Sequence, residues 1–344
     1  MTRELCTLFD SNYLIKAVAL QRSLLATDAD FHLTCFCFDE PAQEVMEALE
    51  LPRLSTVSLD ELETFDQDLR SVKEGRSPVE YCWTATPAVP RYLLATRPEV
   101  AEVTYIDADL MFFSGPEPLF EELGDASVLI VPHRYAPEYM HHVINGVYNV
   151  EFLVFRRDGH GEQVLKWWHD RCIEWCYYRL EDGKLGDQKY LDDWPERFDR
   201  VHVLAHKGGG LAPWNLSQYD IHRRGGEVFV DDDPLIFFHY HGLRLRENGR
   251  HRLAPPGYVL SPAARELVYE PYLEALRVAA DLVRERAPWF PIILDPTPRR
   301  AELLSEARIA VTERIIQGIP PLMSLRTRRA ARLGSREPLG DGRR

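Results

Sequence analysis

The segment Val103-Thr-Tyr-Ile-Asp107-Ala-Asp109-Leu-Met-Phe-Phe113 places two carboxylates, two residues apart, between two apolar runs. Successive side chains of an extended segment point to opposite faces, so Asp107 and Asp109 project to the same side. At the end of a buried strand, this geometry suits a hard divalent cation, which prefers oxygen ligands and can in turn bind a diphosphate. The segment therefore predicts a strand over residues 103–106 that ends at a metal site.

The Asp-x-Asp pattern is not diagnostic by itself, because the chain contains three further copies, at residues 28–30, 66–68 and 231–233. Those copies lie in polar, turn-like surroundings that are typical of solvated surface. Only the copy at Asp107 follows one strand-like apolar run and precedes another. Its context, rather than the pattern, identifies it as a candidate site.

Strand and helix signals alternate along the first hundred residues, which predicts a mostly parallel α/β sheet flanked by helices. The expected strands are residues 5–9, 31–38, 54–59 and 103–106, and the expected helices are 14–25, 41–51 and 88–95. Residues 60–80 are acidic and polar, and we expect a surface segment or a mobile loop there. Further strands are expected at 127–132, 148–155, 201–204, 227–230 and 235–241, and further helices at 162–179, 188–194, 270–286 and 300–317.

A chain of 344 residues exceeds the size of roughly 250–300 residues at which a single core stops growing, so a helical appendage or a second lobe is expected. We divide the chain into a nucleotide-binding half (1–113), a second half of the same domain (114–254), a helical extension (255–320) and a basic tail (321–344). The tail, rich in Arg, Gly and Pro from residue 325 onward, is expected to be disordered.

The net charge of −13 argues against a general nucleic-acid binder and against broad attraction to anionic lipid. No apolar run approaches the roughly 20 residues that span a bilayer, and the N-terminus carries no signal region. The six cysteines lack zinc-finger spacing and are expected to be reduced core residues: Cys6, Cys35, Cys37, Cys82, Cys172 and Cys176. These features predict a cytoplasmic protein.

Polar side chains follow the first strand at Phe9-Asp10-Ser-Asn12-Tyr13. The carboxyl ends of strands are where open α/β sheets bind ligands. Asp10 could accept a hydrogen bond from a nucleobase, and Tyr13 could stack on the base. The alternative is an Asx turn that caps the next helix.

Two further segments are candidates for contacts with phosphate or sugar. Arg91, on the helix before the Asp-pair strand, could neutralise phosphate, although an ordinary exposed arginine is the alternative. Gly186-Asp187-Gln188 opens a short helix, where Asp187 is a good N-cap candidate. Both roles are compatible, because a helix N-terminus also presents polar groups to a ligand.

The segment Phe237-Phe-His239-Tyr-His241-Gly242-Leu-Arg244-Leu-Arg246 closes a strand with two histidines on one face. A single strand histidine is more often a core residue than a metal ligand. A histidine followed three residues later by Gly, and then by cations, is a better candidate for metal and phosphate binding. Imidazole beside two carboxylates favours Mn²⁺ over Mg²⁺.

Together these segments resemble the glycogenin-like, galactosyltransferase-type (GT8) family of retaining glycosyltransferases, which have the GT-A fold. The resemblance covers residues 4–246 and rests on an ordered set: Phe9-Asp10-x-Asn12-Tyr13, Arg91, Asp107-x-Asp109, Asn149, Gly186-Asp187-Gln188 and His239-x-x-Gly242. It implies a GT-A mixed sheet flanked by helices, with a C-terminal helical extension. It also implies Mn²⁺, or alternatively Mg²⁺, bound by Asp107, Asp109 and His239.

The resemblance also implies roles for the other residues. It implies that Asp10, Asn12 and Tyr13 bind the uridine of the donor. It also implies that Arg91, Asn149 and Asp187 contact the donor sugar and its phosphates. Gln188 is implied to lie near the anomeric carbon, which makes Gln188 and Asp187 the catalytic candidates. The complete donor-binding set is Thr7, Phe9, Asp10, Asn12, Tyr13, Arg91, Asp107, Ala108, Asn149, Glu151, Gly242 and Arg244.

Three features depart from the family pattern. Glu151 stands where the family usually has glycine, so it either reshapes the sugar pocket or serves the reaction. Leu245 stands where the family has a phosphate-binding lysine, and Arg244 or Arg246 is the candidate replacement. The glycine-rich segment 207–215 is expected close to the site, but it has no Lys-Ser/Thr after its glycines and is not a P-loop.

The expected activity is metal-dependent transfer of a sugar from a nucleotide diphosphate donor, a UDP-sugar, to a hydroxyl of a glycan, a lipid-linked acceptor or a small molecule. The alternatives are a nucleotide-sugar-binding scaffold that has lost turnover, and a sugar-nucleotidyltransferase. The latter needs a Gly-rich, basic N-terminal loop, which Asp10–Tyr13 is not. The C-terminal helices could mediate dimerisation or peripheral membrane docking, or they could form a lid over the sheet.

Overall fold

The computed structural model describes residues 2–27, 29–296 and 300–316, which belong to two units divided at residue 297. The second unit contains the helix α12 (Arg300–Ile316), close to the helix expected at 300–317. The predicted disorder from residue 325 onward lies outside the described residues. Among the helices that the structure describes, none combines the length and the apolar character needed to cross a membrane.

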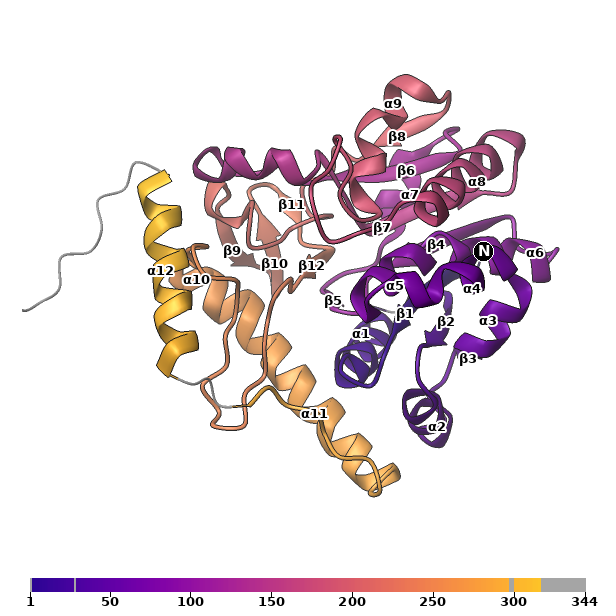
Figure 1. The fold of residues 1–344 in the computed structure, drawn as a ribbon. Helices are drawn as coiled ribbons and strands as arrows, with labels where there is room; N and C mark the ends of the chain where they lie inside the picture. The colour runs from indigo at the N-terminus through magenta and orange to yellow at the C-terminus, as the bar shows by residue number, and fades with distance from the viewer. Residues whose placement is uncertain (1, 28, 297–299, 317–344) are drawn as a thin grey trace, which may run out of the picture. The chain divides into compact units, whose positions relative to one another are not determined.

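A seven-stranded mixed sheet forms the centre of the first unit, in the order β3-β2-β1-β4-β7-β6-β8 (Figure 1). Its strands are β1 (Arg3–Phe9), β2 (Phe31–Cys37), β3 (Leu54–Ser58), β4 (Glu102–Ile106), β6 (Val128–Pro132), β7 (Tyr148–Arg156) and β8 (Val201–Val203). The first four strands are parallel, whereas β7 runs antiparallel to both β4 and β6. Seven of the nine expected strands are in this sheet, and the α/β fold class is confirmed.

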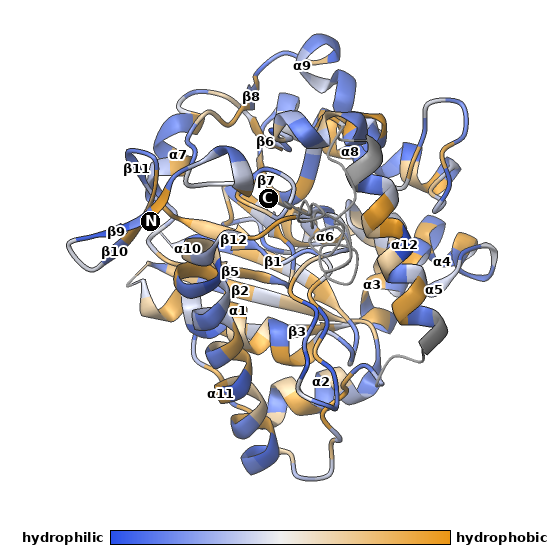
Figure 2. Ribbon diagram, turned by 90° about the vertical axis from the view of Figure 1, so that its left-hand side faces the viewer, coloured by the Kyte–Doolittle hydropathy of each residue, from blue (hydrophilic) through white to orange (hydrophobic). Residues whose placement is uncertain are grey.

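The sheet is buried on both faces, as a sheet with crossover helices must be. Successive residues of β7 alternate between two hydrophobic cores: Phe152 and Val154 belong to one, Leu153 and Phe155 to the other. The strands accordingly appear mostly hydrophobic in Figure 2, whereas the turn between β9 and β10 is hydrophilic. The helices that cover the sheet are α1 (Leu14–Ala26), α2 (Glu40–Ala48), α5 (Pro78–Ala85), α6 (Ala88–Thr96), α7 (Glu117–Leu123), α8 (Gly159–Glu174) and α9 (Trp194–Arg197).

Residues 60–80 lie largely at the surface, as expected, but they are helical and do not form a loop. The segment forms α3 (Leu59–Phe65), α4 (Gln67–Val72), a 3₁₀ turn (Lys73–Gly75) and the start of α5. Ser58 and Asp66 cap the two helices by accepting hydrogen bonds from the backbone N–H groups of Glu61 and Leu69, both at 3.0 Å. Local capping and two buried leucines, Leu62 and Leu69, therefore outweigh the polar composition.

Two short antiparallel elements lie outside the central sheet. A two-stranded ribbon joins β5 (Leu110–Phe112) to β12 (Phe237–His239), and β9 (Ile221–Arg224), β10 (Glu227–Val230) and β11 (Asp233–Pro234) form a small sheet. The strand expected at 235–241 is thus shorter than predicted.

The C-terminal part of the first unit packs onto the core. It contains α10 (Pro262–Ala264), a π-helical turn (Arg265–Tyr269) and α11 (Glu270–Arg286), which packs on α1. Tyr272 of α11 stacks on Tyr240, with ring centroids 3.6 Å apart, and the Tyr240 hydroxyl donates to the Val268 carbonyl at 2.9 Å. These contacts connect the helical extension to the residue that follows β12.

Candidate functional site

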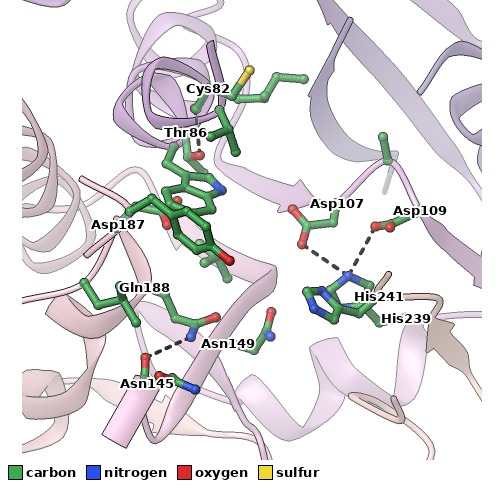
Figure 3. Close-up of a pocket in the computed structure, with 18 of the residues that line it drawn as sticks. Cys82, Thr86, Asp107, Asp109, Asn145, Asn149, Asp187, Gln188, His239 and His241 are labelled. Carbon is green, nitrogen blue, oxygen red and sulfur yellow. Dashed lines mark hydrogen bonds and ion pairs between the residues drawn. The ribbon is translucent and has the colours of Figure 1, made fainter. Parts of the chain in front are cut away.

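A cavity of about 830 Å³ lies at the carboxyl ends of β1 and β4. This is the edge of an open α/β sheet where ligands bind. Figure 3 shows polar side chains facing the cavity from several segments that are distant in the sequence. Most of the predicted site residues line it: Phe9, Asp10, Asn12, Tyr13, Asp107, Ala108, Asp109, Asn149, Asp187, Gln188 and His239.

The structure brings the three predicted metal ligands together. Nε2 of His239 lies 3.7 Å from Oδ2 of Asp107 and 3.2 Å from Oδ1 of Asp109 (Figure 3). One ligand atom from each residue lies within 4.8 Å of the other two. Two carboxylates and one imidazole at this spacing fit a divalent transition-metal ion.

The backbone explains why these residues meet. Asp107 directly follows β4, Asp109 directly precedes β5, and His239 is the last residue of β12. In the β5–β12 ribbon, Leu110 is paired with His239, and the Tyr240 N–H donates to the Asp109 carbonyl at 3.0 Å. A shift of one residue in this register would move the imidazole to the other face of the ribbon.

Burial and mutual charge set the protonation of this cluster. Burial raises the pKa of Asp107 to about 6. Burial also acts to raise the pKa of Asp109, but His239 and Lys16 hold that pKa below its ordinary value. Burial alone would lower the pKa of His239, yet Asp109 and Glu151 raise it well above its ordinary value. In the metal-free protein, a proton on His239 therefore compensates the carboxylates.

Lys16 is a member of this cluster that the sequence analysis missed. Its ammonium lies 3.6 Å from Oδ2 of Asp109 and 3.8 Å from the centre of the Tyr13 ring. Its side chain is only 9% exposed, and burial lowers its pKa. In the sequence, Lys16 is the one charged residue of the otherwise apolar run 14–20. A lysine in such a helix is easily taken for a surface residue.

Glu151, which was expected in the donor-binding set, lies behind the cluster rather than in the cavity lining. Its side chain is 1% exposed, and its Oε2 is 2.6 Å from Nδ1 of His239. The carboxylate thus contacts the ring nitrogen that points away from Asp107 and Asp109. Its backbone N–H donates to Oδ1 of Asn149 at 2.7 Å.

The Gly186-Asp187-Gln188 segment lines the cavity opposite the acidic pair. Gly186 has φ +55°, and a Cβ there would lie 3.2 Å from the Trp83 ring, so both the backbone conformation and the close approach favour glycine. Burial raises the pKa of Asp187 to about 7. Asp187 occupies the N-cap position of the 3₁₀ helix Gln188–Asp193, but the expected capping hydrogen bond is absent. Gln188 donates through Nε2 to the Asn145 carbonyl at 3.2 Å.

An aromatic wall completes the cavity on the side of His239, and the sequence analysis missed it. His133, Tyr135, Trp214 and His241 all line this side. The Trp214 ring stands perpendicular to that of His239, with centroids 5.5 Å apart. Burial lowers the pKa of His133 to about 3 and that of His241 to about 4, so both rings are neutral. The sequence analysis singled out His241 beside His239 and the glycine-rich segment 207–215, which contains Trp214, but not His133 or Tyr135.

The Asx turn expected at Asp10 is present, and the same segment also lines the cavity. Asp10 accepts from the backbone N–H of Asn12 at 3.0 Å and from its side-chain amide at 2.9 Å, which is the expected Asx turn. Asp10, Asn12 and Tyr13 nevertheless line the cavity, and the Tyr13 side chain is 40% exposed.

Four predicted residues lie elsewhere. Arg91 forms an ion pair with Asp66 at 3.1 Å and is not part of the cavity lining. Thr7 is fully buried in β1. Gly242 and Arg244 line a smaller neighbouring cavity of about 320 Å³, where Arg244 pairs with Asp295 at 2.7 Å. The smaller cavity shares Asn12 and Tyr13 with the larger one, so Gly242 and Arg244 lie next to the main cavity without lining it.

Comparisons with known proteins agree with this architecture. No family model matches the chain. The uncharacterized protein YfnF of Bacillus subtilis (strain 168) is 36% identical over 253 residues, which cover 71% of this chain and 83% of YfnF. The uncharacterized protein YfnD of the same organism is 30% identical over 287 residues, which cover 83% of this chain and 92% of YfnD.

Among solved structures, the galactosyltransferase LgtC in complex with donor and acceptor sugar analogues matches with a TM-score of 0.50 and 14% sequence identity. The match covers 88% of this chain and 99% of LgtC. The seven-stranded sheet with flanking helices found here matches the GT-A glycosyltransferase architecture. The chain therefore belongs to the family of the Bacillus subtilis proteins YfnF and YfnD, and it has the GT-A fold, with structural similarity to GT8-type glycosyltransferases.

Proposed function

We propose that the protein is a metal-dependent, retaining glycosyltransferase that moves a sugar from a nucleotide diphosphate donor, a UDP-sugar, to an acceptor hydroxyl. One observation carries this proposal: Asp107, Asp109 and His239 converge at the ligand-binding edge of a GT-A sheet, beside a cavity of about 830 Å³. The complex of LgtC with donor and acceptor sugar analogues supports a sugar-binding role for a cavity in this fold.

The three converging side chains would hold Mn²⁺ or, less favourably, Mg²⁺. The imidazole of His239 favours Mn²⁺, because Mg²⁺ prefers sites made of oxygen alone. The bound ion would supply Lewis-acid stabilisation of the negative charge on the leaving diphosphate. Asp109, whose pKa is held low by His239 and Lys16 despite burial, is the ligand that is ionised throughout the physiological range.

The family resemblance assigns roles at the donor to five further residues that line the cavity. Asp10, Asn12 and Tyr13 would bind the nucleoside, and Asn149 and Asp187 the sugar. Because its pKa is raised to about 7, Asp187 is partly protonated at neutral pH and can then donate a hydrogen bond to a sugar hydroxyl. The Nε2 of Gln188 is engaged by Asn145, so its amide oxygen is the atom that would face the anomeric carbon.

The second candidate function is a nucleotide-sugar-binding scaffold that has lost turnover, with Glu151 as the substitution responsible for the loss. The Glu151 carboxylate instead contacts His239 from behind and leaves the cavity open. This position favours an enzyme over a scaffold. Binding of UDP and Mn²⁺ without any donor hydrolysis, over a full panel of nucleotide-sugars, would favour the scaffold.

The proposal is tested with Asp109→Asn and a matched control, Asp68→Asn, which changes an exposed aspartate in another Asp-x-Asp copy. Mn²⁺-dependent hydrolysis of nucleotide-sugars would be measured for both variants, and UDP binding by calorimetry. Asp109→Asn should lower turnover by about two orders of magnitude or more, because a metal ion supplies several kcal/mol of charge stabilisation. Asp68→Asn should behave as wild type. Full activity of Asp109→Asn in the presence of EDTA would refute the metal assignment.

A further inference from the structure

The Glu151 carboxylate is buried behind the candidate metal site and does not line the cavity. Glu151 lies in β7, a central strand of the sheet, and its side chain is 1% exposed. Placing an ionised carboxylate in such an interior costs several kcal/mol unless a partner compensates it. Its Oε2 lies 2.6 Å from Nδ1 of His239, which identifies the imidazole as that partner.

The contact determines which nitrogen of His239 faces the acidic pair. A neutral imidazole carries its proton on one nitrogen and a lone pair on the other, and a metal ion binds the lone pair. A carboxylate at Nδ1 keeps the proton there, so the lone pair is on Nε2. Nε2 is the atom that lies 3.2 Å from Asp109 and 3.7 Å from Asp107.

The surroundings of Glu151 preserve this arrangement. The backbone N–H of Glu151 donates to Oδ1 of Asn149, and Trp214 packs perpendicular to the His239 ring on its other side. Gly210 keeps space beside the carboxylate, because a Cβ there would lie 3.2 Å from Oε1 and only 2.4 Å from Cγ1 of Val131. Oε1 itself is buried and has no hydrogen-bond partner among the described residues.

We propose that Glu151 is a positioning residue that holds the His239 imidazole in the tautomer and orientation needed for metal binding. The proposal rests on the proposed function, since it assumes that His239 is a metal ligand. Hydrogen bonds to the distal nitrogen of a ligating histidine typically change metal affinity by about 10- to 100-fold when they are removed. Glu151 therefore replaces the family's glycine with a carboxylate that supports the metal site and does not touch the substrate.

The experiment measures Mn²⁺ affinity of the full chain by the EPR signal of free Mn²⁺, without substrate or turnover. Glu151→Ala should weaken binding by about 10- to 100-fold, whereas Glu151→Gln, whose amide oxygen can still accept from Nδ1, should lose less. The matched control is Glu4→Gln. Glu4 also contacts a histidine Nδ1, that of His32 at 3.3 Å, but it lies on β1 towards the opposite edge of the sheet.

A second readout separates positioning from general structural support. In metal-free, ¹⁵N-histidine-labelled protein at a pH where the ring is neutral, His239 should be a single Nδ1–H tautomer, and Glu151→Ala should shift that equilibrium. Mn²⁺ binding and a tautomer signal unchanged in Glu151→Ala would overturn the proposal. If Glu151→Ala fails to fold, wild-type affinity in both Glu151→Gln and Glu151→Leu overturns it equally. Absence of Mn²⁺ binding by the wild type would instead refute the metal site of the proposed function.

Discussion

Acidification should release the metal ion, because protons compete with it for the same side-chain atoms. Asp107 must be ionised to bind a cation, and burial raises its pKa to about 6. His239 must be neutral at Nε2, whereas Asp109 and Glu151 raise its pKa well above the ordinary value in the metal-free protein. Asp109 keeps a lowered pKa and so remains ionised, which leaves the other two groups to determine the pH dependence.

The size of the effect follows from these two groups. With a pKa of about 6, roughly one Asp107 in eleven is ionised at pH 5 and ten in eleven at pH 7, which alone weakens binding about tenfold on acidification. Release of the His239 proton acts in the same direction. The logarithm of the Mn²⁺ affinity should therefore rise by more than one unit between pH 5 and pH 7, and should continue to rise above pH 7.

Titration of free Mn²⁺ by EPR at pH 5, 6, 7 and 8 measures this dependence, with near-UV circular dichroism at each pH to verify that the protein stays folded. Asp107→Asn serves as the internal comparison, because it removes one of the two titrating groups. Its affinity should be lower, but it should depend less steeply on pH. Equal Kd values for the wild type at pH 5 and pH 7, within a factor of two, would contradict the reasoning.

Two further substitutions test the surroundings of the site. Lys16→Met removes an ammonium 3.6 Å from Asp109, so Mn²⁺ should bind roughly fivefold more tightly, about 1 kcal/mol of relieved repulsion. Unchanged or weaker binding by calorimetry would show that Lys16 does not compete with the ion. Tyr240→Phe deletes the hydrogen bond to the Val268 carbonyl and should lower the free energy of unfolding by about 1 kcal/mol in urea, because that carbonyl is left unpaired. Mn²⁺ affinity of this variant should stay at the wild-type value, and a parallel loss of affinity would contradict a purely structural role.

Most of the sheet was predictable because its strands are rich in apolar and β-branched residues and alternate with helical segments along the chain. The errors have local causes. Residues 60–80 look like a loop by composition, and their helices depend on the caps at Ser58 and Asp66 and on two leucines that pack inward. The strand β5 has three residues, which is too few for a periodic pattern to emerge.

The centre of the site was predictable, and its supporting residues were not. The Asp-x-Asp motif and the His-x-x-Gly motif contain Asp107, Asp109 and His239, the three side chains that the structure brings together. The position of Lys16 depends on which side of α1 is covered by other elements, which one sequence does not reveal. Strand alternation places Asn149 and Glu151 on the same face of β7, but only packing shows that Asn149 lines the cavity while Glu151 lies deeper, against His239.

The pairing of β5 with β12 has a consequence for biosynthesis. During translation, Asp107 and Asp109 leave the ribosome long before His239, because β12 follows the whole second half of the sheet. A nascent chain that ends before Phe237 carries both acidic groups without the imidazole. Contacts between such distant segments form late, so the three side chains converge only after β12 has paired with β5. Under the proposed function, the metal ion would therefore bind as a last step of maturation, and a shortage of that ion during translation would not prevent the chain from folding.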